Sequence, residues 1–172
     1  FKLLTSDNSL DTKTKESNNY PKALIVDDNT EMISYLKDIF SDFIDCTFAF
    51  NGKEALRNVR EKSFDLIISD LRMPEMDGAQ FKKELNKIDH YKDIPFILIT
   101  SVSNLTSLSL KNTLGFNEYI EKPFTKSEII SRVQFSLERT LNRKKILGVD
   151  TTNIDFESSS KTLIHQIKEC IL

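Results

Sequence analysis

The chain has 172 residues, and its 24 lysines and arginines nearly balance 26 aspartates and glutamates, which gives a net charge of −2. This balance excludes a large basic surface for nucleic acid. Apolar runs of only four to five residues exclude a membrane span. The two cysteines, Cys46 and Cys170, lie far apart without metal-ligand spacing, which favours a reduced, cytoplasmic protein. The chain does not begin with methionine, so we expect it to be a piece of a longer protein.

The composition divides the chain into three parts. Residues 1–20 are polar and poor in large apolar side chains, which is typical of a linker. Residues 21–142 carry regularly spaced apolar segments and form the predicted domain. Residues 143–172 begin with a short basic cluster and a polar connector and end in an amphipathic stretch. We interpret this last part as a linker and the start of a downstream effector segment.

The first half of the predicted domain begins with a strand and a helix. ALIV (23–26) is an unbroken apolar run that predicts a strand, and apolar residues then recur at spacings of three and four, which predicts a helix. Those residues are Met32, Ile33, Leu36, Ile39 and Phe40. CTFAF (46–50) predicts a second strand. Asn51 is a favourable N-cap for the next helix, and Glu54 stands where a capping box places it.

The second half continues the alternation of strands and helices. Three more strands are predicted, at 64–69, 95–100 and 118–120. Asp77 and Gln80 have the spacing of a capping box and predict the start of a helix. Thr125 and Glu128 repeat that spacing before a long final helix. Another helix is expected over 105–114, although its serine, threonine and asparagine residues have mediocre helix propensity.

This alternation predicts an α/β fold, namely a doubly wound, five-stranded parallel sheet flanked by five helices. The strand cores are unbroken apolar runs, as expected for strands that are covered on both faces. Ligands of such sheets bind beyond the carboxyl ends of the strands. The chemistry-bearing residues that the predicted strands place there are Asp27, Asp28, Asp70, Thr100 and Lys122.

Each of these residues also has an ordinary structural interpretation. An aspartate after a strand usually caps a helix, but the helix after Asp70 is predicted to start only near Gly78. Taken singly, the structural and functional interpretations are about equally good; their joint placement favours function. Carboxylates in one pocket repel one another unless a hard cation such as Mg²⁺ neutralises them. A nearby lysine and hydroxyl would suit a phosphoryl group, and an aspartate can be its nucleophile.

Four motifs in order, "ALIVDDN", "DLIISDLRMPEMDG", "ILITS" and "GFNEYIEKPF", together resemble the receiver domain of two-component response regulators. The resemblance extends from about Pro21 to Leu141. It implies a flavodoxin-like fold and a cytoplasmic signalling module. It also implies that Asp70 accepts a phosphoryl group from a histidine kinase or a phosphotransfer domain.

The resemblance implies a metal site as well. Asp28, Asp70 and the main-chain carbonyl of Arg72 would hold Mg²⁺, with Asp27 acting partly through water. Mn²⁺ is expected to substitute for Mg²⁺. No other cofactor is implied.

The same family pattern implies a switch. Thr100 and Lys122 would contact the phosphoryl group, and Tyr119 would turn inward as Thr100 moves. The Lys122–Pro123 peptide bond is expected to be cis. The output surface would comprise the helix at 105–114, the strand at 118–120 and the last helix.

Partners beyond the kinase are less defined by the sequence. The winged-helix class of regulators pairs through charged positions of the output surface, and Glu118, Glu128 and Arg132 match three of them. Leu108 stands where a basic residue would be, so a homodimer and a solvated charged face both stay open. We expect an effector domain outside this chain, and no direct contact of the receiver with nucleic acid or membrane.

Three alternatives to a phosphorylated receiver have weaker support in the sequence. A degenerate receiver would act only as an interaction module, but the acidic set and the lysine are complete. A flavodoxin-like nucleotide or flavin carrier needs a phosphate-binding loop after the first strand, where the acidic "DDNT" stands. A phosphatase with an aspartyl intermediate expects a second aspartate at the position of Arg72.

Overall fold

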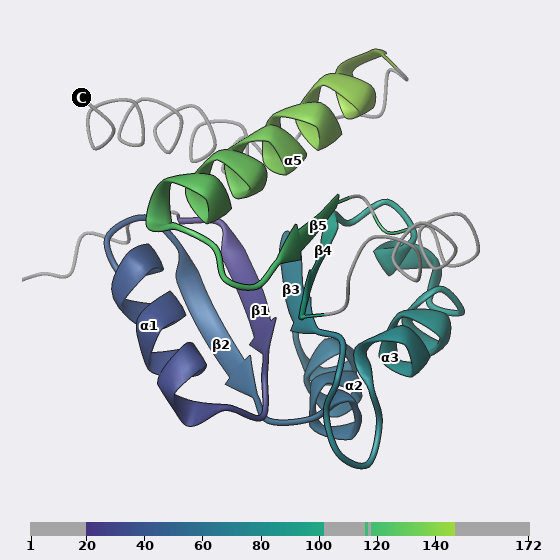
Figure 1. The fold of residues 1–172 in the computed structure, drawn as a ribbon. Coiled ribbons are helices and arrows are strands. Elements are labelled where there is room, and N and C mark those ends of the chain that lie inside the picture. Colours follow the sequence, from purple (N-terminus) through teal and green to yellow (C-terminus); the bar gives the residue numbers. More distant parts are fainter. Residues whose placement is uncertain (1–19, 102–115, 117, 147–172) are drawn as a thin grey trace, which may run out of the picture.

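The computed structural model describes residues 20–101, 116 and 118–146. Strands and helices alternate along these residues (Figure 1). The strands are β1 (Lys22–Val26), β2 (Asp45–Ala49), β3 (Leu66–Asp70), β4 (Phe96–Thr100) and β5 (Glu118–Glu121). The helices are α1 (Thr30–Phe40), α2 (Gly52–Glu61), α3 (Gly78–Leu85) and α5 (Lys126–Ile146), and a short 3₁₀ helix spans Asp89–Tyr91.

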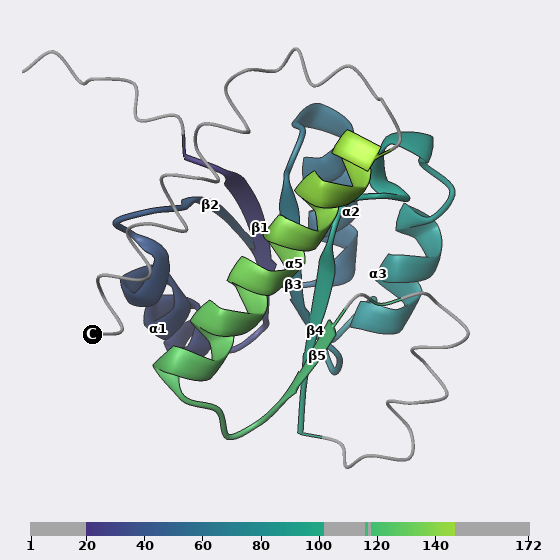
Figure 2. The ribbon, with the colours of Figure 1, turned by 90° about the horizontal axis from the view of Figure 1, so that it is seen from above.

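The five strands form one sheet in the order β2-β1-β3-β4-β5, and every neighbouring pair is parallel. Helices α1 and α5 lie on one face of the sheet, and α2 and α3 lie on the other (Figures 1 and 2). The predicted doubly wound parallel sheet is therefore confirmed. Because all strands run the same way, their carboxyl ends share one edge, where the predicted site residues lie.

Alternate strand residues build two separate cores. Ile25, Ile68 and Ile97 pack with apolar side chains of α1 and α5. Their sequence neighbours, such as Leu24 and Ile67, pack on the opposite face with α2 and α3. Strands buried on both faces need apolar residues at consecutive positions, which explains why their sequences do not alternate.

The predicted caps of α2 and α3 are confirmed, with one difference in detail. The side chain of Asn51 accepts the N–H of Glu54 at 2.9 Å, and that of Asp77 accepts the N–H of Gln80 at 2.7 Å. The Glu54 carboxylate, however, accepts the N–H of Phe50 at 2.8 Å, one residue before the cap. This bond still satisfies a main-chain donor at the start of α2, as a capping box does.

Some boundaries of strands and helices differ from those predicted from the sequence, and some predicted segments lie outside the described residues. Strand β3 begins two residues later than predicted and includes Asp70, so this carboxylate belongs to the strand itself. Helix α5 continues to Ile146. The helix expected over 105–114 and the segments at 1–19 and 147–172 lie outside the described residues. Among the helices that are described, none has the length and apolar character needed to cross a membrane.

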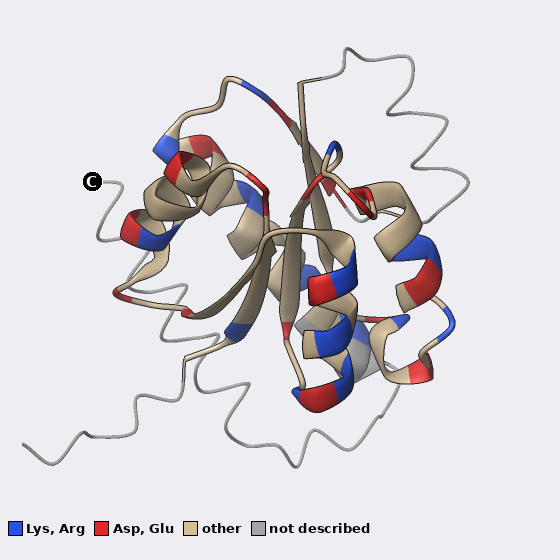
Figure 3. Ribbon diagram, turned by 90° about the horizontal axis from the view of Figure 1, so that it is seen from below, with Lys and Arg blue, Asp and Glu red and all other residues tan. Residues whose placement is uncertain are grey.

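Acidic and basic residues are mixed over the surface of the domain. Figure 3 shows red and blue residues interspersed along the helices, in keeping with the net charge of −2.

Cys46 is a free thiol on the edge strand β2, where burial raises its pKa to about 12. A thiol with so high a pKa is a poor nucleophile at neutral pH.

Candidate functional site

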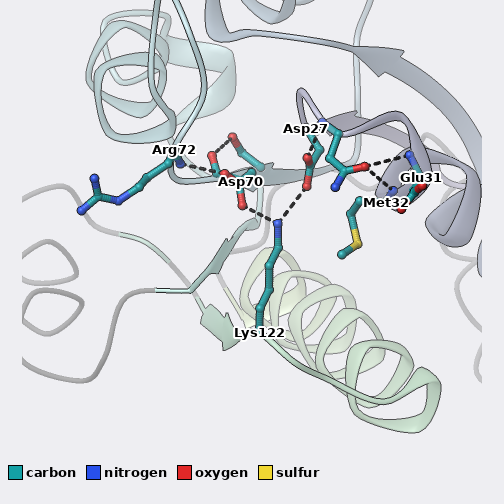
Figure 4. Close-up of polar contacts among 8 residues, drawn as sticks. Asp27, Glu31, Met32, Asp70, Arg72 and Lys122 are labelled. Atoms are coloured by element: carbon teal, nitrogen blue, oxygen red, sulfur yellow. Dashed lines mark hydrogen bonds and ion pairs between the residues drawn. The ribbon is translucent and has the colours of Figure 1, made fainter.

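Three charged side chains from three strand ends meet at the carboxyl edge of the sheet (Figure 4). Asp27 follows β1, Asp70 ends β3, and Lys122 follows β5. Nζ of Lys122 lies 3.1 Å from Oδ2 of Asp27 and 2.7 Å from Oδ1 of Asp70. The parallel sheet thus brings together the two carboxylates and the lysine that the sequence predicts to lie near one another.

Local turns orient both carboxylates. Oδ2 of Asp70 accepts the N–H of Arg72 at 2.7 Å, and Oδ1 of Asp27 accepts the N–H of Asn29 at 2.9 Å. An aspartate that binds the main chain two residues further on forms an Asx turn, which fixes the side-chain direction. Asp70 is therefore not a cap of α3, but it is not bare either, because one oxygen holds the turn and the other faces Lys122.

Burial and charge act against each other in this cluster. Asp27 is 2% exposed and Asp70 is 7% exposed. Burial raises the pKa of Asp27, the Asn29 N–H and Lys122 partly offset this, and the charge of Asp70 adds to it. For Lys122, burial alone would lower the pKa, but hydrogen bonds and charge from Asp70 and Asp27 raise it overall. Lys122 therefore stays protonated at neutral pH and neutralises part of the acidic pair.

One of the two predicted switch residues, Thr100, lies beside this cluster. Thr100 ends β4 and is buried, and its carbonyl accepts the main-chain N–H of Lys122 at 2.8 Å. Tyr119 on β5 is half-buried and packs against the core beneath α2 and α3. The Lys122–Pro123 peptide bond is cis, as expected. The structure thus ties the ends of β4 and β5 together next to Asp70.

The predicted metal ligands are only partly gathered. Asp28 is exposed just past β1, and the Arg72 side chain is exposed while its N–H binds Asp70. Within the described residues, no three aspartate, glutamate, histidine or cysteine side chains converge as one metal site. Asp27 and Asp70 nevertheless approach one cation position, which the ammonium of Lys122 occupies. These two carboxylates and one ammonium leave one negative charge, and carboxylate oxygens suit Mg²⁺, so Asp27 and Asp70 fit part of a site for a hard divalent cation.

Two glycines hold the loop after Asp70 in place, a feature that the sequence reading did not assign. The N–H of Gly78 donates to the carbonyl of Leu71 at 2.9 Å, and that of Gly52 donates to the carbonyl of Met76 at 3.0 Å. A Cβ added at Gly78 would lie 2.3 Å from the main-chain oxygen of Asp70. A glycine is therefore required where α3 approaches the strand end that carries Asp70.

The clustered charges predict that Asp70→Asn stabilises the metal-free protein. The substitution keeps an oxygen for the Arg72 N–H and removes a charge that raises the pKa of Asp27. It also removes the 2.7 Å ion pair with Lys122, which keeps Asp27 as its partner at 3.1 Å. We expect a gain of about 1 kcal/mol near neutral pH. The raised pKa of Asp27 means that ionised Asp27 destabilises the folded protein, and this cost grows as the pH rises above the ordinary pKa of 3.8. The stability gained by Asp70→Asn should therefore shrink as the pH falls toward 4.

Thermal melts of the wild type, Asp70→Asn and the exposed-site control Asp38→Asn would measure this effect in chelator and in millimolar Mg²⁺. A ligand that binds only the folded protein raises its melting temperature. We therefore expect Mg²⁺ to raise the melting temperature of the wild type more than that of Asp70→Asn. An Asp70→Asn protein that melts below the wild type in chelator would contradict the charge account, as would equal shifts by Mg²⁺.

Comparison with known proteins places these features in a family. Residues 23–134 match the family model "Response regulator receiver domain". The chain is 33% identical over 117 residues to Hybrid signal transduction histidine kinase D of Dictyostelium discoideum, which covers 67% of this chain and 7% of that protein. It is 30% identical over 120 residues to the transcriptional regulatory protein PrrA of Mycobacterium leprae, covering 69% of this chain and 51% of that one.

Solved structures agree with this assignment. The chemotaxis protein CheY4 of Vibrio cholerae superposes with a TM-score of 0.65 at 27% identity, over 68% of this chain and 98% of that one. The receiver domain of a signal transduction histidine kinase from Syntrophus aciditrophicus gives 0.64 at 32% identity, over 69% and 90%. The family model, the relatives and the fold all point to one assignment, and the chain belongs to the response regulator receiver domain family of two-component systems.

Proposed function

We propose that this receiver accepts a phosphoryl group on Asp70 from a histidine kinase or a phosphotransfer domain, in the cytoplasm and with Mg²⁺. The contact between Asp70 and Lys122, at 2.7 Å in a buried strand end, carries the proposal. A surface salt bridge would be exposed and easily screened, whereas this pair is held at the edge where ligands of parallel sheets bind.

Asp70, Lys122 and Thr100 have different roles in the proposed phosphoryl transfer. A carboxylate oxygen of Asp70 forms the bond to phosphorus as the bond from phosphorus to the donor histidine nitrogen breaks. The ammonium of Lys122 neutralises charge on the phosphoryl oxygens, and the hydroxyl of Thr100 supplies a hydrogen bond to them.

Mg²⁺ would be held by Asp27, Asp28, Asp70 and the main-chain carbonyl of Arg72, and Mn²⁺ would substitute for it. When bound, the divalent cation supplies further charge neutralisation at the phosphoryl oxygens.

The output and its partner belong to the same proposal. The chain spans about half the length of the bacterial regulators that it matches, with 51% of PrrA and 52% of CiaR of Streptococcus pneumoniae covered. We propose that a downstream effector domain is switched through the 105–114 segment, β5 and α5. Arg132 already pairs with Glu118 at 3.0 Å inside the chain, so these two charges by themselves do not favour a homodimer.

Intact-mass measurement with a small phosphodonor tests the proposal. We expect the mass of one phosphoryl group to be added in Mg²⁺, little addition in chelator, and none in Asp70→Asn. Asp38→Asn, an exposed carboxylate on α1, serves as the matched control and should be modified like the wild type. If no donor or cognate kinase modifies the folded wild type, the chain acts as an interaction module only. If Asp70→Asn is still modified, Asp70 is not the acceptor.

A further inference from the structure

A groove lies between helix α2 and the loop that follows Asp70. It encloses about 340 Å³ and is lined by Asn51, Lys53, Leu56, Arg57, Arg60 and Glu75. Five of these residues come from α2 and its N-cap, and Glu75 comes from the loop. The groove is separate from the contacts of Lys122 with Asp27 and Asp70.

The lining of the groove is locally basic although the whole chain is acidic. Lys53 lies 3.3 Å from Glu75, which balances its charge. Within the described part of the chain, neither Arg57 nor Arg60 forms an ion pair. Glu84 on the neighbouring α3 is bound by Lys87 at 2.7 Å, and Arg60 adds only a weaker charge interaction with it. Two exposed guanidinium groups therefore lie over one groove, and neither forms an ion pair among the described residues.

The wall opposite α2 is held in a fixed shape. Glu75 has a φ of 63°, in the left-handed region that few residues other than glycine adopt. Its carboxylate meets Lys53 and lies 3.5 Å from the side-chain amide of Asn51. The N–H of Gly52 also donates to the carbonyl of Met76 at 3.0 Å. A groove whose two walls are tied together is preorganised, and binding there orders few groups.

We propose that this groove docks an acidic peptide segment of a partner protein. Arg57 and Arg60 would bind carboxylates, because the planar guanidinium group matches a carboxylate with two parallel hydrogen bonds. Leu56, half-buried on the same helix and part of the groove lining, offers an apolar contact for a neighbouring side chain. A nucleic acid suits the groove less well, since it would bring many negative charges to a chain with a net charge of −2.

An NMR titration with a defined probe tests the proposal. The probe is an amide-capped acidic pentapeptide, four glutamates around one leucine, and its match is the same peptide with glutamine in place of glutamate. We expect amide shifts confined to α2 and the loop around Glu75, and binding by the acidic peptide alone. Arg57→Gln with Arg60→Gln should weaken binding about ten-fold, a loss that corresponds to 1.4 kcal/mol.

Two further double variants make the test specific. Lys37→Gln with Arg139→Gln removes the same charge from exposed sites on α1 and α5 and should leave binding within about two-fold. Arg57→Lys with Arg60→Lys keeps the charge, loses the paired hydrogen-bond geometry, and should bind with intermediate affinity. The proposal is overturned if the peptide does not bind, if its shifts map elsewhere, or if the Lys37 and Arg139 control loses as much. It is also overturned if inorganic phosphate or a single-stranded oligonucleotide binds more tightly than the peptide.

Discussion

Replacing Lys82 by methionine should raise the free energy of unfolding by about 2–3 kcal/mol at pH 7. Lys82 lies on α3 and is only 2% exposed, with its ammonium 5.2 Å from the ring centroid of Phe96. Burial lowers its pKa to about 8. The folded protein must therefore either bury a charge or release a proton at neutral pH. Methionine has a similar length and fills the same space without that cost.

The pH dependence of this effect has a definite sign. The pKa of Lys82 falls from 10.5 to about 8 on folding, so the unfolded chain binds more protons between these two values. The wild type should gain stability as the pH rises through that window, because proton release then favours the folded state. The advantage of Lys82→Met should be full below pH 8 and should shrink toward pH 10.

Denaturant unfolding at pH 7 and near pH 10 would measure this difference. Lys83→Met is the matched control, because Lys83 is the exposed neighbour on the same helix. It should change stability little and by the same amount at both pH values. A Lys82→Met protein that is less stable than the wild type at pH 7, or an advantage that is independent of pH, would contradict the account of a buried cation.

Gly78→Ala should lower the free energy of unfolding by about 3 kcal/mol. The added Cβ would lie 2.3 Å from the main-chain oxygen of Asp70 and 3.1 Å from Oγ of Ser69, so the strand end and α3 must move apart. That movement would displace Asp70 from Lys122, and we expect slower phosphorylation as well.

The matched control for this change is Gln80→Ala, which places the same side chain at an exposed position of the same helix. Denaturant unfolding of the two variants and the wild type should show a loss for Gly78→Ala alone. Equal stability of Gly78→Ala and the wild type would show that the loop yields at little cost, and that the glycine does not fix the site.

The pattern of strand ends in the sequence was enough to predict the centre of the site. A parallel sheet leaves little choice about where its carboxyl ends lie, so Asp27, Asp70 and Lys122 could be placed near one another before their contacts were known. The capping residues Asn51 and Asp77 were predictable for a similar reason, because a cap depends on residues only three positions apart.

Features that depend on exact tertiary distances were not predictable in this way. The helical pattern around Phe81 and Leu85 gives no sign that Lys82 is buried, because that depends on how α3 sits against Phe96 of β4. The simultaneous contact of Lys122 with both carboxylates was not predictable either, because it requires distances of about 3 Å between residues of separate strands. The left-handed conformation of Glu75 likewise arises from the loop between Asp70 and Gly78 rather than from a local sequence signal.

Direct location of the phosphoryl group tests the central proposal, that Asp70 is the acceptor. Borohydride reduces an aspartyl phosphate to homoserine, so the wild type can be exposed to a phosphodonor in Mg²⁺, reduced, digested and analysed by peptide mass. We predict homoserine at position 70 alone, with little in chelator and none in Asp70→Asn. Reduction at Asp27 or Asp28 instead, or an equal yield in chelator, would contradict the assignment of Asp70 and its acidic neighbours.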